Sequence, residues 1–513
     1  MGATRLRSQF RILVAGVWAH NISILTGIGC SIILTPVLIS YLGGEAYGLY
    51  AAVGSVMAYL FVLNLGTGYA VPKYVAECWA RKDIDGLRRL TSSFFCAFLA
   101  LALMLVLLGV LCLPHLHYLF KTSPGLVRLV QVVFFLTVVN FAIILPFGVL
   151  GGVLYGIQEV HINYWLDTLF HILHLLAAYV VLKLGYGLVA VTLGALGARV
   201  VVTLLLLRFV QQRCPGVSVR LRWVNRKLLK DLLTPAFHYL AINVSTLLIF
   251  STDNLVISSL AGVSAVTAFS VASKLCRLPQ GLIFSLGRVL FPHISELDAL
   301  NNVARLRMVH TQLTKYSLLM ALAIFTITAA FGKKVIELWV GPENFAGLPV
   351  LLSFCVLIPV NTVVQSSLVV LMGMARHSRL SWLLMVEGLV NVALSVVLLR
   401  FIGVLGVALG TLISRLGISF WFTPWYACRV LGQSFREYWT GAGAALLPLL
   451  PCAGLAMLVA QVPVSPVLVV FGGSLAIGAA YLLFFYRFSL RRDERELIWN
   501  RVASLLGRST LAA

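Results

Sequence analysis

The feature that most constrains this chain of 513 residues is a succession of about fourteen apolar runs, each long enough to cross a membrane as a helix. Helices suit lipid because each one satisfies its own backbone hydrogen bonds. Of all residues, 60% are hydrophobic and 11% are charged, whereas a soluble domain has about 25% charged residues. The sequence therefore predicts an all-α integral membrane protein. The expected spans are residues 12–41, 47–71, 91–113, 126–156, 162–183, 187–210, 235–260, 266–291, 314–331, 347–373, 381–401, 404–426, 441–461 and 466–486.

The charged residues predict the orientation of these spans. The net charge of +22 comes from 39 Lys+Arg against 17 Asp+Glu. The basic residues lie between the apolar runs, as in membrane loops, so we do not expect nucleic acid as a partner. With the N-terminus inside, the inside segments hold 28 Lys and Arg and the outside segments hold 6. The sequence thus predicts that both termini are cytoplasmic.

Two similar segments indicate an internal duplication. Residues 187–199 and 403–415 share two glycines and a final arginine at an offset of 216 residues. Similar offsets recur where Gly156 and Gly373 end the fourth and tenth spans. Duplicated six-helix halves predict two pseudo-symmetric lobes around a central cavity. The expected organisation is an N-lobe at 1–210, a basic cytoplasmic connection at 211–234, a C-lobe at 235–426, two added helices at 427–486 and a basic cytoplasmic tail at 487–513.

The eighth span carries three cations on one face. Lys274, Arg277 and Arg288 share a helical stripe with small residues, and the stripe extends over roughly 21 Å. Charges are costly in hydrocarbon, so the stripe predicts a water-filled cavity that attracts an anion such as a pyrophosphate. Alternatively, Lys274 pairs with Asp253 of the seventh span, and Arg288 reaches the cytoplasmic edge.

Other spans hold isolated charged or titratable residues. Arg199 and Arg415 lie at matching positions of the two halves, where they either add to the cavity field or lock helices together. Asp167, His171 and His174 share one face of the fifth span. His and Asp can relay protons, so these residues and Asp253 are candidates for proton or ion coupling. The alternative is a polar seam between helices.

The sequence predicts a transporter and not an enzyme. It has no GxxxxGK[ST], HExxH or GxSxG motif. No metal or other cofactor is expected, because the nine cysteines are scattered without a CxxC and the face that holds Asp167, His171 and His174 lacks a Cys or further carboxylates. Any energy for transport must therefore come from an ion gradient or from removal of the product.

Two blocks of sequence resemble the polysaccharide transporter family of the multidrug/oligosaccharidyl-lipid/polysaccharide exporter superfamily, which contains the O-antigen and exopolysaccharide flippases. The first block runs from 41 to 77 and the second from 252 to 292, and the resemblance extends over nearly the whole chain. The motifs that carry it are Leu42-Gly43, Tyr47-Gly48, Leu65-Gly66, Lys73-Tyr74-Val75-Ala76-Glu77, Thr252-Asp253-Asn254-Leu255-Val256-Ile257, Phe269-Ser270-Val271-Ala272-Ser273-Lys274-Leu275 and Phe291-Pro292.

The resemblance implies a V-shaped pair of six-helix bundles in the bacterial inner membrane that works by alternating access. Its substrate would be a polyprenyl-pyrophosphate-linked oligosaccharide, carried from the cytoplasmic to the periplasmic leaflet for polysaccharide biosynthesis. A polymerase and glycosyltransferases would be its partners, together with membrane lipids. The alternatives are a multidrug or cation antiporter of the same superfamily, a lipid II flippase, and a membrane-embedded polysaccharide polymerase or ligase. Arg277 and Arg288 match no family motif, so their expected role depends on the stripe alone.

Overall fold

A computed structural model of the protein describes residues 2–61, 70–225, 237–376, 378–462, 465–490 and 495. Within these ranges the chain is helical and has no strand, and eleven helices are long and apolar enough to cross a membrane. The all-α membrane fold is thereby confirmed. The described parts of the three remaining predicted spans, 47–71, 235–260 and 266–291, are also almost entirely helical, and the total of fourteen stays a prediction.

The chain forms two compact units, Met1–Ser270 and Val271–Ala513. Their boundary lies inside α11 (Val263–Ala299) and not at the predicted connection 211–234. The predicted boundaries follow the sequence repeat, whereas the two units follow the packing of helices. Helices that belong to the second repeat, α9 and α10, therefore belong to unit 1 by their contacts.

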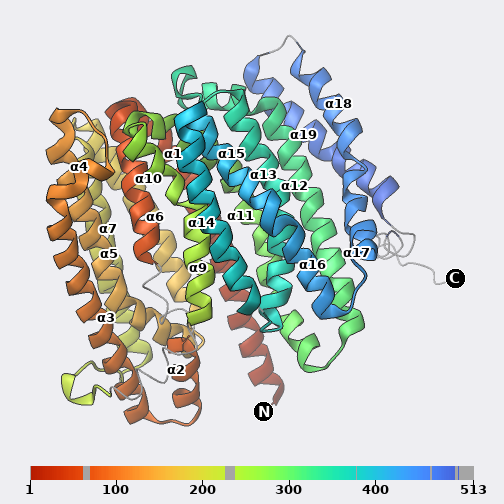
Figure 1. Ribbon diagram of the computed structural model, residues 1–513. Coiled ribbons are helices and arrows are strands. Elements are labelled where there is room, and N and C mark those ends of the chain that lie inside the picture. The colour runs from red at the N-terminus through yellow and green to blue at the C-terminus, as the bar shows by residue number, and fades with distance from the viewer. Residues whose placement is uncertain are drawn as a thin grey trace. The chain divides into compact units, whose positions relative to one another are not determined.

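Unit 1 begins with a long helix that bends where the first two predicted spans meet. Gly43 has a φ of 78° and interrupts α1 between the expected spans 12–41 and 47–71, because glycine adopts positive φ without a steric penalty. The other helices of this unit are labelled in Figure 1. The elements are α1 (Gly2–Phe61), α2 (Ala70–Ala80), α3 (Ile84–Cys112), η2 (Leu113–His115), α4 (Leu116–Leu119), η3 (Pro124–Leu126), α5 (Val127–Gly156), α6 (Val160–Lys183), α7 (Leu188–Arg213), η4 (Leu221–Trp223), α9 (Phe237–Phe250) and α10 (Thr252–Leu260).

Packing in unit 1 joins helices that are far apart in the sequence. α5 packs against α3 and α7, and α6 packs between α1 and α7. Buried apolar side chains such as Phe94, Phe141 and Val149 form a core among α2, α3 and α5. The opposite face of α3 exposes Leu103, Leu107 and other large apolar residues, as expected for a helix that borders lipid.

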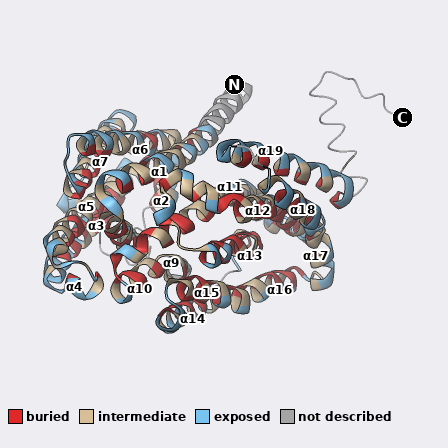
Figure 2. Ribbon diagram, turned by 90° about the horizontal axis from the view of Figure 1, so that it is seen from above, coloured by how far each residue is buried: buried red, intermediate tan, exposed pale blue. Residues whose placement is uncertain are grey.

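Unit 2 is arranged around α13, whose apolar part is mostly buried. α12, α15 and α16 pack against α13, and Figure 2 shows exposed residues on α18 and α19. A second core joins α12 to α18 and α19. Besides the C-terminal part of α11, the elements are α12 (Val303–Val340), η6 (Pro342–Asn344), α13 (Leu348–Gly373), α14 (Ser378–Ile402), α15 (Val404–Ser414), η7 (Arg415–Ser419), α16 (Phe420–Leu431), α17 (Phe435–Ala442), η8 (Gly443–Leu446), α18 (Leu449–Ala460), α19 (Pro466–Phe484) and η9 (Phe485–Ser489).

One close contact recurs in both units. A methyl group at Gly156, the last residue of α5, would overlap Val75 of α2. At Gly373, the last residue of α13, it would overlap Ile294 of α11. These are the two glycines that the sequence matches between the repeats, so the predicted duplication has a structural counterpart at this contact.

Candidate functional site

Two of the three predicted cavity cations lie at mid-depth on α11. Lys274 and Arg277 are both half-buried in unit 2. They lie 11 and 14 residues from the start of α11, or roughly 17 and 21 Å along its axis. The side chain of Arg288 lies outside the described residues. The alternative pairing of Lys274 with Asp253 would join the two units, so it stays a prediction.

The neighbouring face of α11 packs against α13. Cys276 lies 4.0 Å from Cys355 between their sulfur atoms, and the buried Gln280 amide donates to the Leu357 carbonyl at 3.4 Å. This face lies roughly 120° around the helix from the cationic stripe. The packing of unit 2 therefore fixes the rotation of α11 through Cys276 and Gln280.

A small cavity of about 10 Å³ lies among α11, α12 and α13, and Phe284, Ser317 and Gln365 are among its lining residues. Binding sites for small molecules usually occupy about 300–1,000 Å³. The cavity is therefore too small for an oligosaccharide, and none of the predicted cations lines it.

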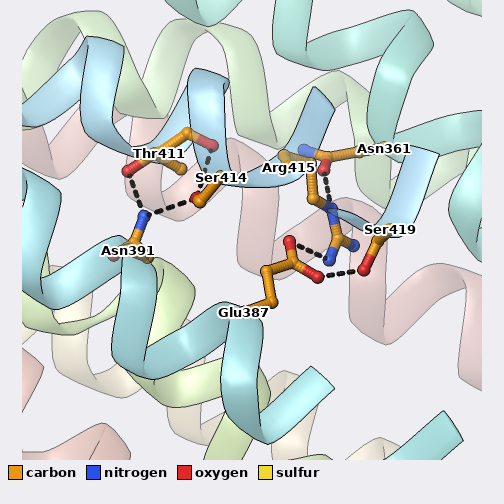
Figure 3. A network of polar contacts seen from close by, with 7 residues as sticks. All are labelled: Asn361, Glu387, Asn391, Thr411, Ser414, Arg415 and Ser419. Atoms are coloured by element: carbon orange, nitrogen blue, oxygen red, sulfur yellow. Dashed lines mark hydrogen bonds and ion pairs between the residues drawn. The ribbon is translucent and has the colours of Figure 1, made fainter. Parts of the chain in front are cut away.

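Arg415 lies in a closed polar network in unit 2 (Figure 3). Its Nη1 atom is 3.0 Å from Glu387 Oε1 on α14, and its Nε donates to Asn361 Oδ1 on α13 at 2.9 Å. The Ser419 hydroxyl donates to the second oxygen of Glu387. Arg415 is 6% exposed and Glu387 is fully buried. These contacts support the helix-locking alternative for Arg415.

A π-helical turn shapes this network. Residues Arg415–Ser419 form η7, a single π-helical turn between α15 and α16. Isolated π turns inside α-helices often occur at functional sites. Arg415 and Ser419 are the first and last residues of this turn, and both reach Glu387. Next to this network, the amide of Asn391 on α14 donates to Thr411 and Ser414 of α15. These contacts extend the polar seam between α14 and α15.

Unit 1 gathers the predicted coupling residues on α6 and α7. Asp167 is exposed, whereas His171, His174 and Arg199 are half-buried. Asp167 and Arg199 are close enough to interact electrostatically. The guanidinium carbon of Arg199 lies 3.8 Å from the centre of the Phe170 ring. Among the described residues, Arg199 Nε and His174 Nε2 have no hydrogen-bond partner.

The α1 helix covers part of this cluster. His20 packs against Tyr164 of α6 with ring centres 4.6 Å apart, and Gly27 lies against the imidazole of His171. The polar residues predicted to share one face of α6 therefore lie between α1 and α7. Elsewhere in unit 1, Asp253 is 2% exposed in the first turn of α10. In the described part of the chain, His, Cys, Asp and Glu nowhere gather in threes that could hold a metal ion.

A buried histidine in unit 2 was not predicted as a site residue. His310 is fully buried on α12, with its ring nitrogens 3.0 Å from Ser367 Oγ and 3.3 Å from Gln433 Oε1. Its ring stacks on Tyr438 with centres 4.5 Å apart. The distribution of Lys and Arg placed residues 292–315 in an inside segment, yet α12 begins at Val303 and buries Leu306 and His310, although the other residues from 303 to 308 are exposed. The helical pattern that runs without a break through 303–340 was the sequence signal that could have placed His310 in a helix.

Comparison with known proteins identifies related sequences. Residues 13–298 match the profile of a family described as polysaccharide biosynthesis protein. The Bacillus subtilis (strain 168) protein named "Uncharacterized membrane protein EpsK" is 18% identical over 496 residues, which are 95% of this chain and 98% of that protein.

Solved structures share the fold. The lipid II flippase MurJ in an inward closed conformation superposes with a TM-score of 0.72 at 15% identity, over 95% of this chain and 100% of that one. An inward-facing multidrug resistance MATE transporter of the MOP superfamily gives 0.66 at 16% identity, over 81% and 94%. A MOP superfamily transporter from Pyrococcus furiosus gives 0.59 at 17% identity, over 81% and 96%.

Proposed function

The chain belongs to the polysaccharide biosynthesis protein family, and from this premise we propose that it is a flippase for a polyprenyl-pyrophosphate-linked oligosaccharide. It moves the lipid-linked glycan from the cytoplasmic to the periplasmic leaflet of a bacterial inner membrane. Glycosyltransferases supply this substrate, and a polymerase consumes it. Both termini face the cytoplasm, as the distribution of Lys and Arg predicts.

The observation that carries the proposal is the pair of half-buried cations at mid-depth of α11, Lys274 and Arg277. Pyrophosphate oxygens form strong charge-assisted hydrogen bonds with ammonium and guanidinium groups. Cations at this depth offset part of the loss of hydration when the diphosphate leaves the headgroup region. The glycan itself needs a polar path, and the lipid chain stays in the bilayer.

Alternating access is supported by the shared fold. A substrate site at mid-membrane depth that opens to one side at a time is the general arrangement of duplicated transporters. The proposed flippase accordingly exposes Lys274 and Arg277 first to the cytoplasmic side and then to the periplasmic side. No bond of the substrate is made or broken, so the described residues need to bind and release only.

A flipping assay tests the proposal. The purified protein is reconstituted into liposomes with a fluorescent polyprenyl-pyrophosphate oligosaccharide, and a membrane-impermeant reductant reports which leaflet holds the probe. We expect flipping by the wild-type protein, and a rate lower by roughly 100-fold or more for Lys274→Gln/Arg277→Gln, because hydrogen bonds to charged groups contribute about 1.5–3 kcal/mol each and about 1.4 kcal/mol corresponds to a tenfold change in rate. The matched control Arg400→Gln removes an exposed arginine at the end of α14 and should flip normally.

The same liposomes separate the alternatives. Export of organic cations without flipping of the glycolipid would support a drug or cation antiporter. Flipping of lipid II in preference to the oligosaccharide substrate would support a lipid II flippase. Extension of the glycan chain by the purified protein would support a polymerase. Any of these results would contradict the proposed substrate.

A further inference from the structure

A basic segment after α7 is held against the beginning of α3. Residues 214–225, here called the strap, follow the last residue of α7 and include η4. The Ser92 hydroxyl donates to the Ser218 carbonyl at 3.2 Å and accepts from the Arg220 backbone N–H at 3.1 Å. The Asn225 N–H donates to Ser93 Oγ at 2.8 Å. The strap is therefore held in one arrangement against α3, although many of its side chains are exposed.

The contacts between the strap and α3 indicate the depth of the membrane at which the strap lies. Arg88 donates to the Gly216 carbonyl at 2.9 Å, and with Ser92 it brackets residue 91, where the apolar run of α3 begins. Polar groups at the start of an apolar span lie in the headgroup region of the bilayer. The strap thus lies beside the headgroups at this end of unit 1.

Three arginines surround one indole ring in the strap. The guanidinium carbons of Arg88, Arg220 and Arg222 lie 5.4, 5.2 and 5.0 Å from the centre of the Trp223 ring. Any two of them are thus at most about 11 Å apart, close to the Debye length of about 8–10 Å in physiological salt. Like charges at this spacing repel, and the ring offsets only part of that repulsion.

Only one of these charges has a carboxylate partner in the described part of the chain. Arg88 pairs with Asp85 at 3.2 Å. The side chains of Arg220 and Arg222 are exposed and have no ion pair there. The nearby Glu159 pairs with Arg213 instead, at 3.6 Å. Within the part of the chain that the structure describes, two exposed cations therefore remain for an anion to bind.

Apolar side chains in the same strap indicate where that anion comes from. Leu221, between the two exposed arginines, is 81% exposed, and Val219 is 37% exposed. An exposed leucine beside arginines and a tryptophan is the pattern of a membrane-interface anchor. A soluble anion would leave these apolar residues without a contact, whereas a phospholipid presents a phosphate and an acyl chain together.

We propose that the strap is a binding site for an anionic phospholipid of the adjoining leaflet. Arg220 and Arg222 hold the phosphate group, Trp223 lies at the level of the glycerol, and Leu221 contacts the upper acyl chain. The bound lipid fixes this end of α3 and α7 in the membrane. The site does not depend on the substrate that the protein carries.

Quenching of Trp223 fluorescence by brominated lipids tests the site in the full-length protein. The protein is reconstituted into phosphatidylcholine vesicles that contain brominated phosphatidylglycerol or brominated phosphatidylcholine. The signal of Trp223 is the difference between the wild-type protein and Trp223→Phe. We expect a preference for phosphatidylglycerol that falls roughly 10- to 30-fold in Arg220→Gln/Arg222→Gln, at about 1 kcal/mol for each arginine.

Two matched variants keep the test specific. Arg305→Gln/Arg376→Gln makes the same change of charge at exposed arginines of unit 2 and should leave the quenching of Trp223 unchanged. Arg220→Lys/Arg222→Lys keeps both charges and should retain most of the preference. Native mass spectrometry of retained phosphatidylglycerol, higher for the wild-type protein than for the glutamine variant, gives a reading that does not require Trp223→Phe to fold.

Three results would overturn the proposal. The first is equal quenching of wild-type Trp223 by the two brominated lipids. The second is an unchanged preference in Arg220→Gln/Arg222→Gln. The third is loss of the preference in millimolar inorganic phosphate but not in chloride of equal ionic strength, which would assign the strap to a soluble phosphate compound.

Discussion

Two helix pairs at matching positions of the repeat each carry an arginine, and the surroundings of the two arginines differ. Arg199 on α7 and Arg415 at the end of α15 are related by an offset of 216 residues, and the same offset relates His171 on α6 to Glu387 on α14. In unit 2 the arginine thus has a carboxylate partner 3.0 Å away. In unit 1 the matching position holds an imidazole, and the arginine lies over Phe170.

The two pairs also differ in how closely their backbones approach. A methyl group at Gly406 of α15 would overlap the Leu398 carbonyl group of α14. The matching residue of α7 is Ala190, so the α6–α7 pair already accommodates that methyl. The α14–α15 pair is therefore closely packed and electrostatically neutral at its centre, whereas the α6–α7 pair is looser and keeps a half-buried cation.

The two arginines therefore differ in how many of their polar groups are already bonded. A buried, fully hydrogen-bonded ion pair fixes the relative rotation of α14 and α15. A half-buried arginine beside Asp167 and two histidines keeps bonding capacity for a ligand or a proton. The same repeat position thus serves as a lock in unit 2 and remains available in unit 1.

The largest expected effect on stability comes from breaking the ion pair between Glu387 and Arg415. Glu387→Gln leaves the Arg415 charge buried without a carboxylate, and such a change lowers the free energy of unfolding by about 3–5 kcal/mol. Reversible denaturation of the protein in micelles measures it. The control Glu296→Gln removes a carboxylate that is 67% exposed and should change stability by less than about 0.5 kcal/mol.

Removing both charges identifies the cause. Glu387→Leu/Arg415→Met should restore most of the lost stability, because apolar replacement of a whole buried pair is often neutral. If the double variant is as unstable as Glu387→Gln, the packing of these side chains and not their charge holds the helices. If Glu387→Gln itself is neutral, the pair does not act as a lock.

An intermediate effect is expected from the close backbone approach. Gly406→Ala forces α14 and α15 apart and should lower the free energy of unfolding by about 1–3 kcal/mol. Gly197→Ala on α7 is the matched control, since no atom lies within 4 Å of the added methyl; it should be neutral or stabilising by up to about 1 kcal/mol. A Gly406→Ala variant as stable as the wild-type protein would mean that α14 and α15 are not packed this closely.

The smallest effect on stability is expected from replacing Arg199, which has no carboxylate within ion-pair distance among the described residues. Arg199→Gln should lower the free energy of unfolding by only about 0.5–1 kcal/mol, the range of a cation–π contact that is not fully desolvated. Flipping activity should nevertheless fall, roughly 10-fold or more, if the half-buried charge serves transport. A loss of stability as large as that of Glu387→Gln, with normal flipping per folded molecule, would make Arg199 a second lock.

Much of the fold could be predicted from local patterns. Apolar runs predicted the helices and the break between spans 12–41 and 47–71, where Gly43 lies, because length and hydropathy decide what can cross a bilayer. The spacing of 3, 4 and 3 residues among Tyr164, Asp167, His171 and His174 placed them on one face of α6. The depth of Lys274 and Arg277 on α11 also followed from counting residues.

The contacts between helices could not be predicted in the same way. Arg415 and Glu387 are 28 residues apart on different helices, and both lie on polar stripes that could face several neighbours. The rotation of each helix, set by packing at glycines such as Gly406, decides which side chains meet. His310 was missed because the inside segment was drawn by charge, although the helix continues through it.

By itself, the sequence determined that this protein lies in a membrane as a series of helices, and where its charges fall along each one. Those properties depend on chain-local quantities, hydrophobicity and helical periodicity. Only the tertiary structure decided that Arg415 forms an ion pair with Glu387 while Arg199 lies over Phe170, and that Arg88 of α3 reaches Trp223. Such outcomes depend on distances between residues that are remote in the sequence, and close packing of whole helices sets those distances.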